Sequence, residues 1–429
     1  MKTFQNPPQS LWNAILQRPL MDVTGLYGTV QKILDEIKKD GDIALCKYSL
    51  QFDGVELTQF EVQKEEFEEA AKKVEPALKN AIQLAARNIE SFHSAQKPGT
   101  VILETMPGVN CWQKAVPIDK VGLYVPGGSA PLFSTVLMLA IPARIAGCPE
   151  IVLCTPPGQD GKINPAILFA AQFSGVKKVY KLGGVQAIGA MAYGTASVPK
   201  VFKIFGPGNQ YVTAAKQLVS MSQVAIDMPA GPSEVMVVAD SSANPAFVAS
   251  DLLSQAEHGG DSQVVLVTNN DEFAIQVKRQ VDQQLQQLPR KTFAEKALGN
   301  SIVIVLNNKN QIIELINSYA PEHLILSTSD YKDLADKIVN AGSVFLGNFT
   351  PESAGDYASG TNHTLPTNGW ARTYSGVNLD SFVKKVTFQE ITPEGLENIG
   401  PAVEVMAAAE QLDAHKNAVT IRLKQNQKK

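Results

Sequence analysis

The run Val121-Gly122-Leu123-Tyr124-Val125-Pro126-Gly127-Gly128 sets the pattern for the middle of the chain. Its first five residues predict a short buried strand, and the Pro-Gly-Gly sequence ends that strand. A long apolar helix pattern follows from Leu132 to Ala146, and Gly147 closes it. An apolar strand followed by an apolar helix is typical of a parallel sheet that is covered on both faces.

The same alternation continues along the chain and starts a second time at Glu234. The first series goes on as strand 151–154, helix 165–173, strand 179–182, helix 186–193, strand 201–205 and helix 211–219. The second series runs as strand 234–238, helix 245–258, strand 264–268, helix 272–288, strand 302–306, helix 311–319, strand 324–326, helix 331–341 and strand 343–346. Two such series predict an α/β protein with two open, mostly parallel, Rossmann-like sheets that carry helices on both faces.

Both ends of the chain differ from this pattern. Residues 23–95 are helix-rich and charged, and an amphipathic helix pattern over 401–416 follows Gly400. We therefore expect small helical appendages at the two ends and no further sheet layer in the last fifty residues. The expected division is an N-terminal arm (1–22), a first α/β domain (23–120 with 234–377), a second α/β domain (121–233) and a C-terminal helical appendage (378–429).

The composition is that of a globular protein. Of 429 residues, 44% are hydrophobic and 19% are charged, with a formal net charge of −4. This balance argues against a disordered chain and gives no overall field that would attract nucleic acid or an anionic membrane. Residues 1–8 lack a signal-peptide pattern, and no apolar run reaches the ~20 residues of a membrane helix. We expect a cytoplasmic protein.

The four cysteines are Cys46, Cys111, Cys148 and Cys154. None forms a Cys-x-x-Cys pair, which argues against a zinc ribbon or a thioredoxin-like redox site. Cys148 and Cys154 flank a predicted strand, and we expect them to act as small buried apolar residues.

Glycine-rich loops follow three predicted strands of the first series, at 124–128, 182–186 and 205–209. Ligands of α/β sheets bind beyond the carboxyl ends of the strands, and glycine lets the backbone and the next helix approach a phosphate. The dinucleotide fingerprint is incomplete, because Tyr211 stands where the third glycine would be. From these loops alone, a nucleotide or phosphate site and simple tight turns both stay open.

Four of the five histidines lie after residue 250, each in a cluster of polar residues. Gln255 and His258 are three residues apart at the end of a predicted helix, so they share a face. With Asp356 from a predicted Gly/Ser-rich loop and one more histidine, they would complete the shell of a divalent metal. The alternative for this pair is an ordinary polar helix end. The adjacent Glu322 and His323 supply two bases that can act on two different protons.

Several motifs together resemble the histidinol dehydrogenase family, in order and over nearly the whole chain. They are Val121–Ala130, Phe205–Asn209, Asp227–Glu234, Asp251–Gly259, Pro321–His323, Glu352–His363 and Ala414–Asn417. The resemblance implies an intertwined homodimer with one zinc ion per subunit that oxidises L-histidinol to L-histidine with NAD⁺, through a bound aldehyde, in the last steps of histidine biosynthesis. It also implies an atypical Rossmann domain, which accounts for the missing glycine.

The resemblance also implies roles for individual residues. It places Gln255, His258, Asp356 and His415 around zinc. The same four residues, together with Ser233, His323 and Glu410, are then expected to hold the substrate. Tyr124, Gln186 and Asn209 fall at NAD-contacting positions. His323 is expected to take the alcohol proton and Glu322 to activate water, while the C-terminal appendage brings His415 to the partner's zinc.

Three other functions compete with this interpretation. One is a zinc alcohol dehydrogenase of another kind, although such enzymes use cysteine ligands and these cysteines lack the spacing. The second is a zinc hydrolase in which Glu322 activates water. The third is a nucleotide-binding or scaffolding protein without catalytic activity. His93 lies in the charged helical region, and we expect it to be dispensable.

Overall fold

The computed structural model describes residues 1–19, 23–127, 130–229 and 231–426. Gly128 of the first glycine-rich loop and Ala230 of the Asp227–Glu234 motif lie outside the described residues. The chain divides into two compact units. One comprises Met1–Gln96 with Asp119–Phe382, and the other comprises Lys97–Ile118 with Val383–Lys429. No helix among the described residues is long and apolar enough to cross a membrane.

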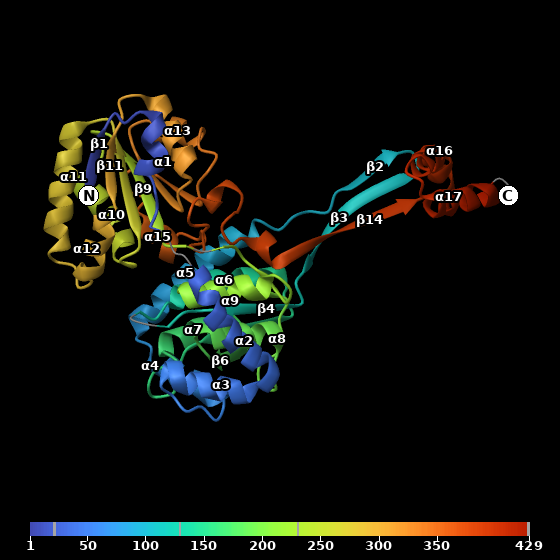
Figure 1. Ribbon diagram of the computed structural model, residues 1–429, viewed down its shortest axis with the longest axis horizontal. Helices are drawn as coiled ribbons and strands as arrows, with labels where there is room; N and C mark the ends of the chain where they lie inside the picture. Colours follow the sequence, from blue (N-terminus) through green and yellow to red (C-terminus); the bar gives the residue numbers. More distant parts are fainter. Residues whose placement is uncertain (20–22, 128–129, 230, 427–429) are drawn as a thin grey trace. The chain divides into compact units, whose positions relative to one another are not determined.

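The first series of strands forms a five-stranded sheet in the larger unit (Figure 1). Its order is β6-β5-β4-β7-β8, and every pair is parallel. The strands are β4 (Lys120–Tyr124), β5 (Glu150–Thr155), β6 (Lys178–Lys181), β7 (Lys203–Phe205) and β8 (Ala225–Ile226). The chain enters this sheet at the central strand β4 and continues through β5 to the edge strand β6. It then returns to the other side of β4, where it forms β7 and the opposite edge strand β8. The switch point, where α/β sheets bind ligands, therefore lies between β4 and β7.

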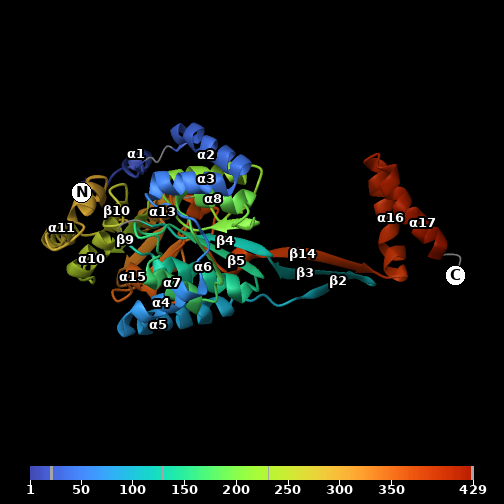
Figure 2. The ribbon, with the colours of Figure 1, turned by 90° about the horizontal axis from the view of Figure 1, so that it is seen from below.

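Two layers of helices cover this sheet. One face carries α2 (Tyr27–Asp40), α3 (Asp42–Tyr48), α8 (Gly184–Tyr193) and α9 (Gln210–Ser220). The other carries α4 (Lys64–Lys73), α5 (Pro76–Ser94), α6 (Phe133–Ala146) and α7 (Pro165–Phe173), as Figure 2 shows. Helix α6 is buried along most of its length, and Gly147 ends it in the left-handed conformation, as its sequence predicts.

Helices α2 to α5 differ from the expected division, which grouped residues 23–120 with the other sheet. The apolar stripe Val30, Ile33, Leu34 and Ile37 of α2 packs into the core of the five-stranded sheet. Gly189 of α8 permits this approach, since a Cβ atom there would lie 2.9 Å from the Ile37 side chain. A helical stripe shows that a face is buried but does not identify its partner, so sequence periodicity could not assign these helices to a sheet.

The second series forms a six-stranded parallel sheet, in the order β1-β11-β10-β9-β12-β13. Its strands are β1 (Lys2–Gln5), β9 (Glu234–Ala239), β10 (Gln263–Thr268), β11 (Ile302–Val305), β12 (His323–Ser327) and β13 (Ser343–Leu346). Winding again starts at a central strand, β9, and the switch point lies between β9 and β12. The N-terminal segment, expected to be a separate arm, supplies β1, which pairs with β11 at the edge. The predicted parallel α/β architecture with flanking helices is confirmed.

Helices also cover both faces of this sheet. One core layer contains α10 (Pro245–Ala256), α11 (Asp271–Leu285) and α12 (Lys291–Gly299). The opposite layer contains α1 (Trp12–Ile15), α13 (Lys309–Tyr319) and α14 (Tyr331–Ala335). A short helix, α15 (Glu352–Tyr357), follows β13.

The smaller unit has an antiparallel sheet that the sequence analysis did not expect. It pairs β14 (Val383–Ile391) with β3 (Val109–Pro117), and β3 with β2 (Ile102–Met106). Two helices follow β14, α16 (Pro393–Ala409) and α17 (Asp413–Asn426), and they pack on each other. The C-terminal region is therefore not only helical. Strand β14 pairs with residues more than 250 positions away, a relation that no local pattern reveals.

Candidate active site

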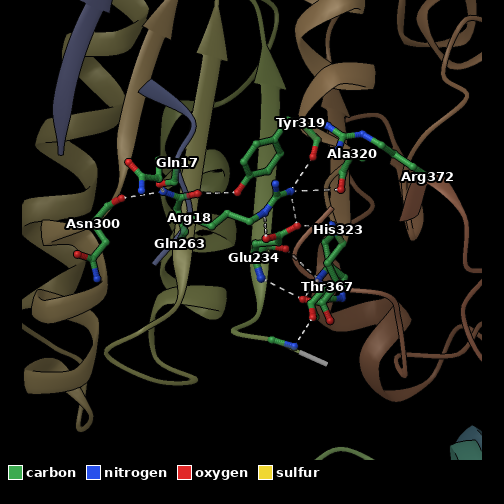
Figure 3. Close-up of polar contacts among 12 residues, drawn as sticks. Gln17, Arg18, Glu234, Gln263, Asn300, Tyr319, Ala320, His323, Thr367 and Arg372 are labelled. Carbon is green, nitrogen blue, oxygen red and sulfur yellow. Dashed lines mark hydrogen bonds and ion pairs between the residues drawn. The ribbon is translucent and has the colours of Figure 1, made fainter. Parts of the chain in front are cut away.

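Several polar residues of the second series lie at the amino edge of the six-stranded sheet, between β9 and β12. Ser233 precedes β9, which begins at Glu234, and Glu322 precedes β12, which begins at His323. The ladder pairs His323 with Val235, so the starts of the two strands lie side by side. Figure 3 shows His323 next to Glu234 at this edge.

Glu322 is held by a reciprocal pair of hydrogen bonds with Glu234. The backbone N–H of Glu234 donates to Glu322 Oε2 over 2.9 Å, and the backbone N–H of Glu322 donates to Glu234 Oε1 over 3.3 Å. Burial raises the pKa of Glu322 to about 7, which suits a general base that works near neutral pH.

The ring of His323 is buried among carboxylates. Its Nδ1 atom lies 3.3 Å from the Glu234 carbonyl oxygen and 3.7 Å from carboxylate oxygens of both Glu322 and Glu352. Its Nε2 atom lies 3.5 Å from Asp356 Oδ1. Burial works against protonation, but the Glu352 and Glu322 carboxylates raise the pKa of His323 well above its usual value. A proton on Nδ1 directed at the Glu234 carbonyl leaves Nε2 as the basic atom.

A group of metal-ligand side chains lies beside this pair. Ligand atoms of His258, Glu352 and Asp356 all lie within 4.8 Å of one another. Gln255, in the last turn of α10, is fully buried, and neither its Oε1 nor its Nε2 atom has a hydrogen-bond partner among the described residues. Buried amides are normally satisfied, and the carbonyl end of a helix favours a cation. The donor set therefore fits a divalent metal ion.

Glu352 was not singled out from the sequence. It is 1% exposed, and its Oε2 atom also lacks a partner in the described part of the chain. Asp356 lies on α15 and not in the expected loop, so Glu352 and Asp356 stand four residues apart on one face of a helix. That spacing is the sequence signal that could have identified Glu352. His363 lies next to them, with its Nδ1 atom 2.8 Å from the Asp356 carbonyl oxygen.

Tyr124, Gln186 and Asn209 line a cavity of about 1000 Å³ at the carboxyl edge of the five-stranded sheet. The hydroxyl of Tyr124 accepts a hydrogen bond from the Gly184 N–H over 3.0 Å, and burial raises the pKa of Tyr124 to about 12, so this hydroxyl keeps its proton. Gln186 Nε2 donates to Asp53 over 3.1 Å, while its buried Oε1 lacks a partner within the described ranges. Asn209 caps the N-terminus of α9.

The remaining expected site residues belong to the smaller unit. Glu410 follows the end of α16, and His415 lies in the first turn of α17. Both residues are solvent-exposed. Their participation in the site stays a prediction.

His93, which was expected to be dispensable, is fully buried in α5. Its Nδ1 atom lies 2.9 Å from the Ile89 carbonyl oxygen, and burial lowers its pKa. Its lack of a catalytic role stays a prediction. Cys148 and Cys154 are buried, as expected.

The chain is similar over its full length to known enzymes. A family model described as histidinol dehydrogenase matches residues 16–423. The chain is 63% identical over 428 residues to the histidinol dehydrogenase of Bacteroides fragilis, covering 100% of both proteins. It is 61% identical over 423 residues to that of Bacteroides thetaiotaomicron, covering 99% of each.

A solved structure gives the same result. The crystal structure of histidinol dehydrogenase from Elizabethkingia anophelis matches with a TM-score of 0.98 at 57% identity, covering 99% of this chain and 98% of that one. The resemblance inferred from the motifs is thereby confirmed. The chain belongs to the histidinol dehydrogenase family.

Proposed function

We propose that this protein oxidises L-histidinol to L-histidine in two NAD-linked steps, through L-histidinaldehyde that stays bound. The observation that carries the proposal is the pair of buried bases, Glu322 and His323, beside a group of metal-ligand side chains in a chain of this family. We further propose that the enzyme acts in the cytoplasm as a homodimer.

Gln255, His258 and Asp356 would hold one zinc ion per subunit, together with His415 of the partner subunit. The unpartnered amide of Gln255 and the closeness of His258 to Asp356 support this assignment. When bound, the ion would supply a positive charge that orients the substrate and lowers the proton affinity of His323. Ser233, Glu410, and His323 itself would contact the substrate as well.

The two bases then have separate tasks. His323 Nε2 accepts the proton of the alcohol in the first oxidation, while its Nδ1–H stays directed at the Glu234 carbonyl. Glu322 takes a proton from water as the aldehyde is hydrated. Its Oε2 atom accepts the Glu234 N–H, so Oε1, which accepts no hydrogen bond from the described residues, is the oxygen proposed for this task. As the hydrate forms, His323 returns its first proton to the former carbonyl oxygen. Its Nε2 atom can then accept the hydroxyl proton of the hydrate in the second oxidation. Burial of both side chains excludes bulk water from the aldehyde.

The cavity at the five-stranded sheet is the proposed site of NAD⁺, which accepts one hydride in each oxidation. Tyr124 and Gln186 offer a hydroxyl donor and an unpartnered carbonyl oxygen. The N-terminus of α9, at Asn209, offers backbone N–H groups beside a glycine-rich loop, an arrangement that favours a pyrophosphate.

NADH yield tests the overall reaction. Two NADH should form for each histidinol consumed, with little free aldehyde, because one site performs both oxidations. A yield near one with accumulation of aldehyde would contradict the two-step mechanism. A zinc hydrolase that uses Glu322 to activate water, the main competing function, would form no NADH from histidinol.

The shared site can be tested by complementation. Glu322→Gln and His415→Asn chains are each expected to convert very little histidinol to histidine, and the two are unfolded and refolded together. A mixed dimer then has one site with an intact Glu322 and an intact His415, and one site with both defects. We expect activity to return to about one working site per mixed dimer. Mixed dimers that co-purify through different tags but stay inactive would show that His415 serves its own subunit.

A further inference from the structure

Arg18 connects the N-terminal segment to the start of β9. Its side chain is 14% exposed, and that of its partner Glu234 is 2% exposed. The guanidinium contacts Glu234 with two nitrogens: Nε donates to Oε2, and Nη2 donates to Oε1 over 2.6 Å. A bidentate pair of this kind fixes the plane and the position of the carboxylate, which a single point charge cannot do.

The same guanidinium also contacts the segment that leads into Glu322. Arg18 Nη2 donates to the carbonyl oxygens of Tyr319 (2.7 Å) and Ala320 (3.3 Å), and the guanidinium lies 3.8 Å from the centre of the Tyr319 ring. Ala320 has a φ of +53°, an unusual value for a residue with a side chain. Arg18 therefore stabilises the turn in which the chain passes from α13 through Pro321 to Glu322.

Both sets of Arg18 contacts involve residues near Glu322, the proposed base. Glu234 accepts the Glu322 N–H with its side chain, and the backbone N–H of Glu234 donates to the Glu322 carboxylate. Figure 3 shows Arg18 between Glu234 on one side and Tyr319 and Ala320 on the other. Glu234, which Arg18 holds by its carboxylate, thus contacts both the side chain and the backbone N–H of Glu322.

We infer that Arg18 is a positioning residue for Glu322 and acts through Glu234. The inference rests on the role proposed above for Glu322 as the base that activates water. It predicts that a change at Arg18 lowers the rate of aldehyde oxidation and leaves metal and substrate binding nearly intact. A structural ion pair without this role would change stability only.

The first test is Arg18→Lys, which keeps the charge but cannot make the bidentate contact and both carbonyl hydrogen bonds. With histidinaldehyde and NAD⁺ as substrates, kcat should fall about 10- to 100-fold, because small misplacements of a reacting group have effects of this size. Both KM values should stay within about threefold of wild type, since a positioning role leaves the binding contacts in place. Zinc content should not change. A wild-type kcat, or a loss of rate that parallels a loss of zinc, would overturn the inference.

A double-mutant cycle separates positioning from general damage. In the Glu322→Gln background, Arg18→Lys should lower the aldehyde rate less than about threefold, because the group that it positions is already gone. If Glu322→Gln is impaired and Arg18→Lys reduces its rate by the full factor, the inference alone is overturned. If Glu322→Gln oxidises the aldehyde at the wild-type rate, both the proposed role of Glu322 and the inference are overturned.

Two further variants keep the test decisive. Arg372→Lys is the matched control, because Arg372 also donates to the end of α13, at the Ser318 carbonyl, and is expected to keep the wild-type kcat. If Arg18→Lys does not fold, the pair Arg18→Met with Glu234→Gln removes both charges together and leaves neither unpaired. This pair should fold and bind zinc, with the same fall in kcat. Full activity in the paired variant would overturn the inference.

Discussion

The two sheets of the larger unit are wound alike but place their polar sites at opposite edges. In the five-stranded sheet, the cavity with Tyr124 and Asn209 lies at the carboxyl edge, at the switch point between β4 and β7. In the six-stranded sheet, Glu322 and His323 lie at the amino edge, between β9 and β12. The same winding therefore supports two different kinds of site.

Helix polarity accounts for this difference. The carboxyl edge of a parallel sheet meets helix N-termini, whose free N–H groups favour anions such as a pyrophosphate. The amino edge meets helix C-termini, and here the last turn of α10 carries Gln255 and is followed by His258. Carbonyl ends favour cations, which suits the proposed zinc ion.

The carboxyl edge of the six-stranded sheet carries a carboxylate that bonds to the neighbouring loops. Asp240, directly after β9, accepts hydrogen bonds from the backbone N–H groups of Ser242 (2.9 Å) and Ser329 (3.0 Å). Burial opposes ionisation, but these bonds lower the pKa of Asp240 overall. At the switch point of this sheet, Asp240 therefore links the loop after β9 to the loop after β12.

The largest effect is expected at the amino edge. His323→Asn should lower kcat for both oxidations about 10²–10⁴-fold, because Nε2 is the proposed proton acceptor. His93→Asn is the matched control, since His93 is equally buried but packs beside the five-stranded sheet. It should lose about 1–3 kcal/mol of stability and keep kcat. Steady-state rates together with thermal unfolding measure both variants, and equal loss of kcat in the two would refute the assignment of His323.

A pH profile tests the second base. Burial raises the pKa of Glu322 to about 7, so the carboxylate loses its basic form as the pH falls through 7. The rate of histidinaldehyde oxidation should therefore show a rising limb near pH 7, apart from any limb at higher pH that comes from deprotonation of His323. In Glu322→Gln, the rate should be lower, and the limb near pH 7 should be absent. If the variant keeps the same limb near pH 7, the group that titrates there is not Glu322.

The smallest effect is expected at the carboxyl edge of the five-stranded sheet. Asn209 and Asn244 both cap helices, α9 and α10, with their side-chain oxygens. Substitution of either by Asp keeps the cap. Asn209→Asp should raise KM for NAD⁺ about tenfold, since a negative charge beside the pyrophosphate costs about 1.4 kcal/mol. Asn244→Asp should leave this KM unchanged. Equal KM values for the two variants would contradict the proposal that NAD⁺ binds at this edge.

The sequence predicted the parts of this structure that depend on local pattern. The alternation of apolar strands and helices was enough to predict the two parallel sheets, and the sequence motifs were enough to identify the family. The pairing of β14 with β3 and the packing of α2 on α8 depend on contacts between distant segments, which no local pattern contains. Glu352 was missed because a glutamate on a short helix is usually solvated, whereas this one is buried beside His323.

The amino-edge location could not be predicted either, because the general rule for α/β sheets points to the carboxyl edge. Glu322 and His323 were recognised as a pair of bases, but only the register of β12 with β9 places them beside Glu234. The role of Arg18 depends on contacts that span more than 200 residues of sequence.

The most direct test of the whole account compares two carboxylates of the six-stranded sheet, Asp356 near its amino edge and Asp240 at its carboxyl edge. Asp356→Asn and Asp240→Asn are purified in parallel, and zinc per subunit is measured together with histidinol turnover. We predict that Asp356→Asn loses zinc and activity while its fold persists, and that Asp240→Asn keeps both. Full zinc content in Asp356→Asn, or loss of zinc in a folded Asp240→Asn protein, would contradict a metal site at the amino edge.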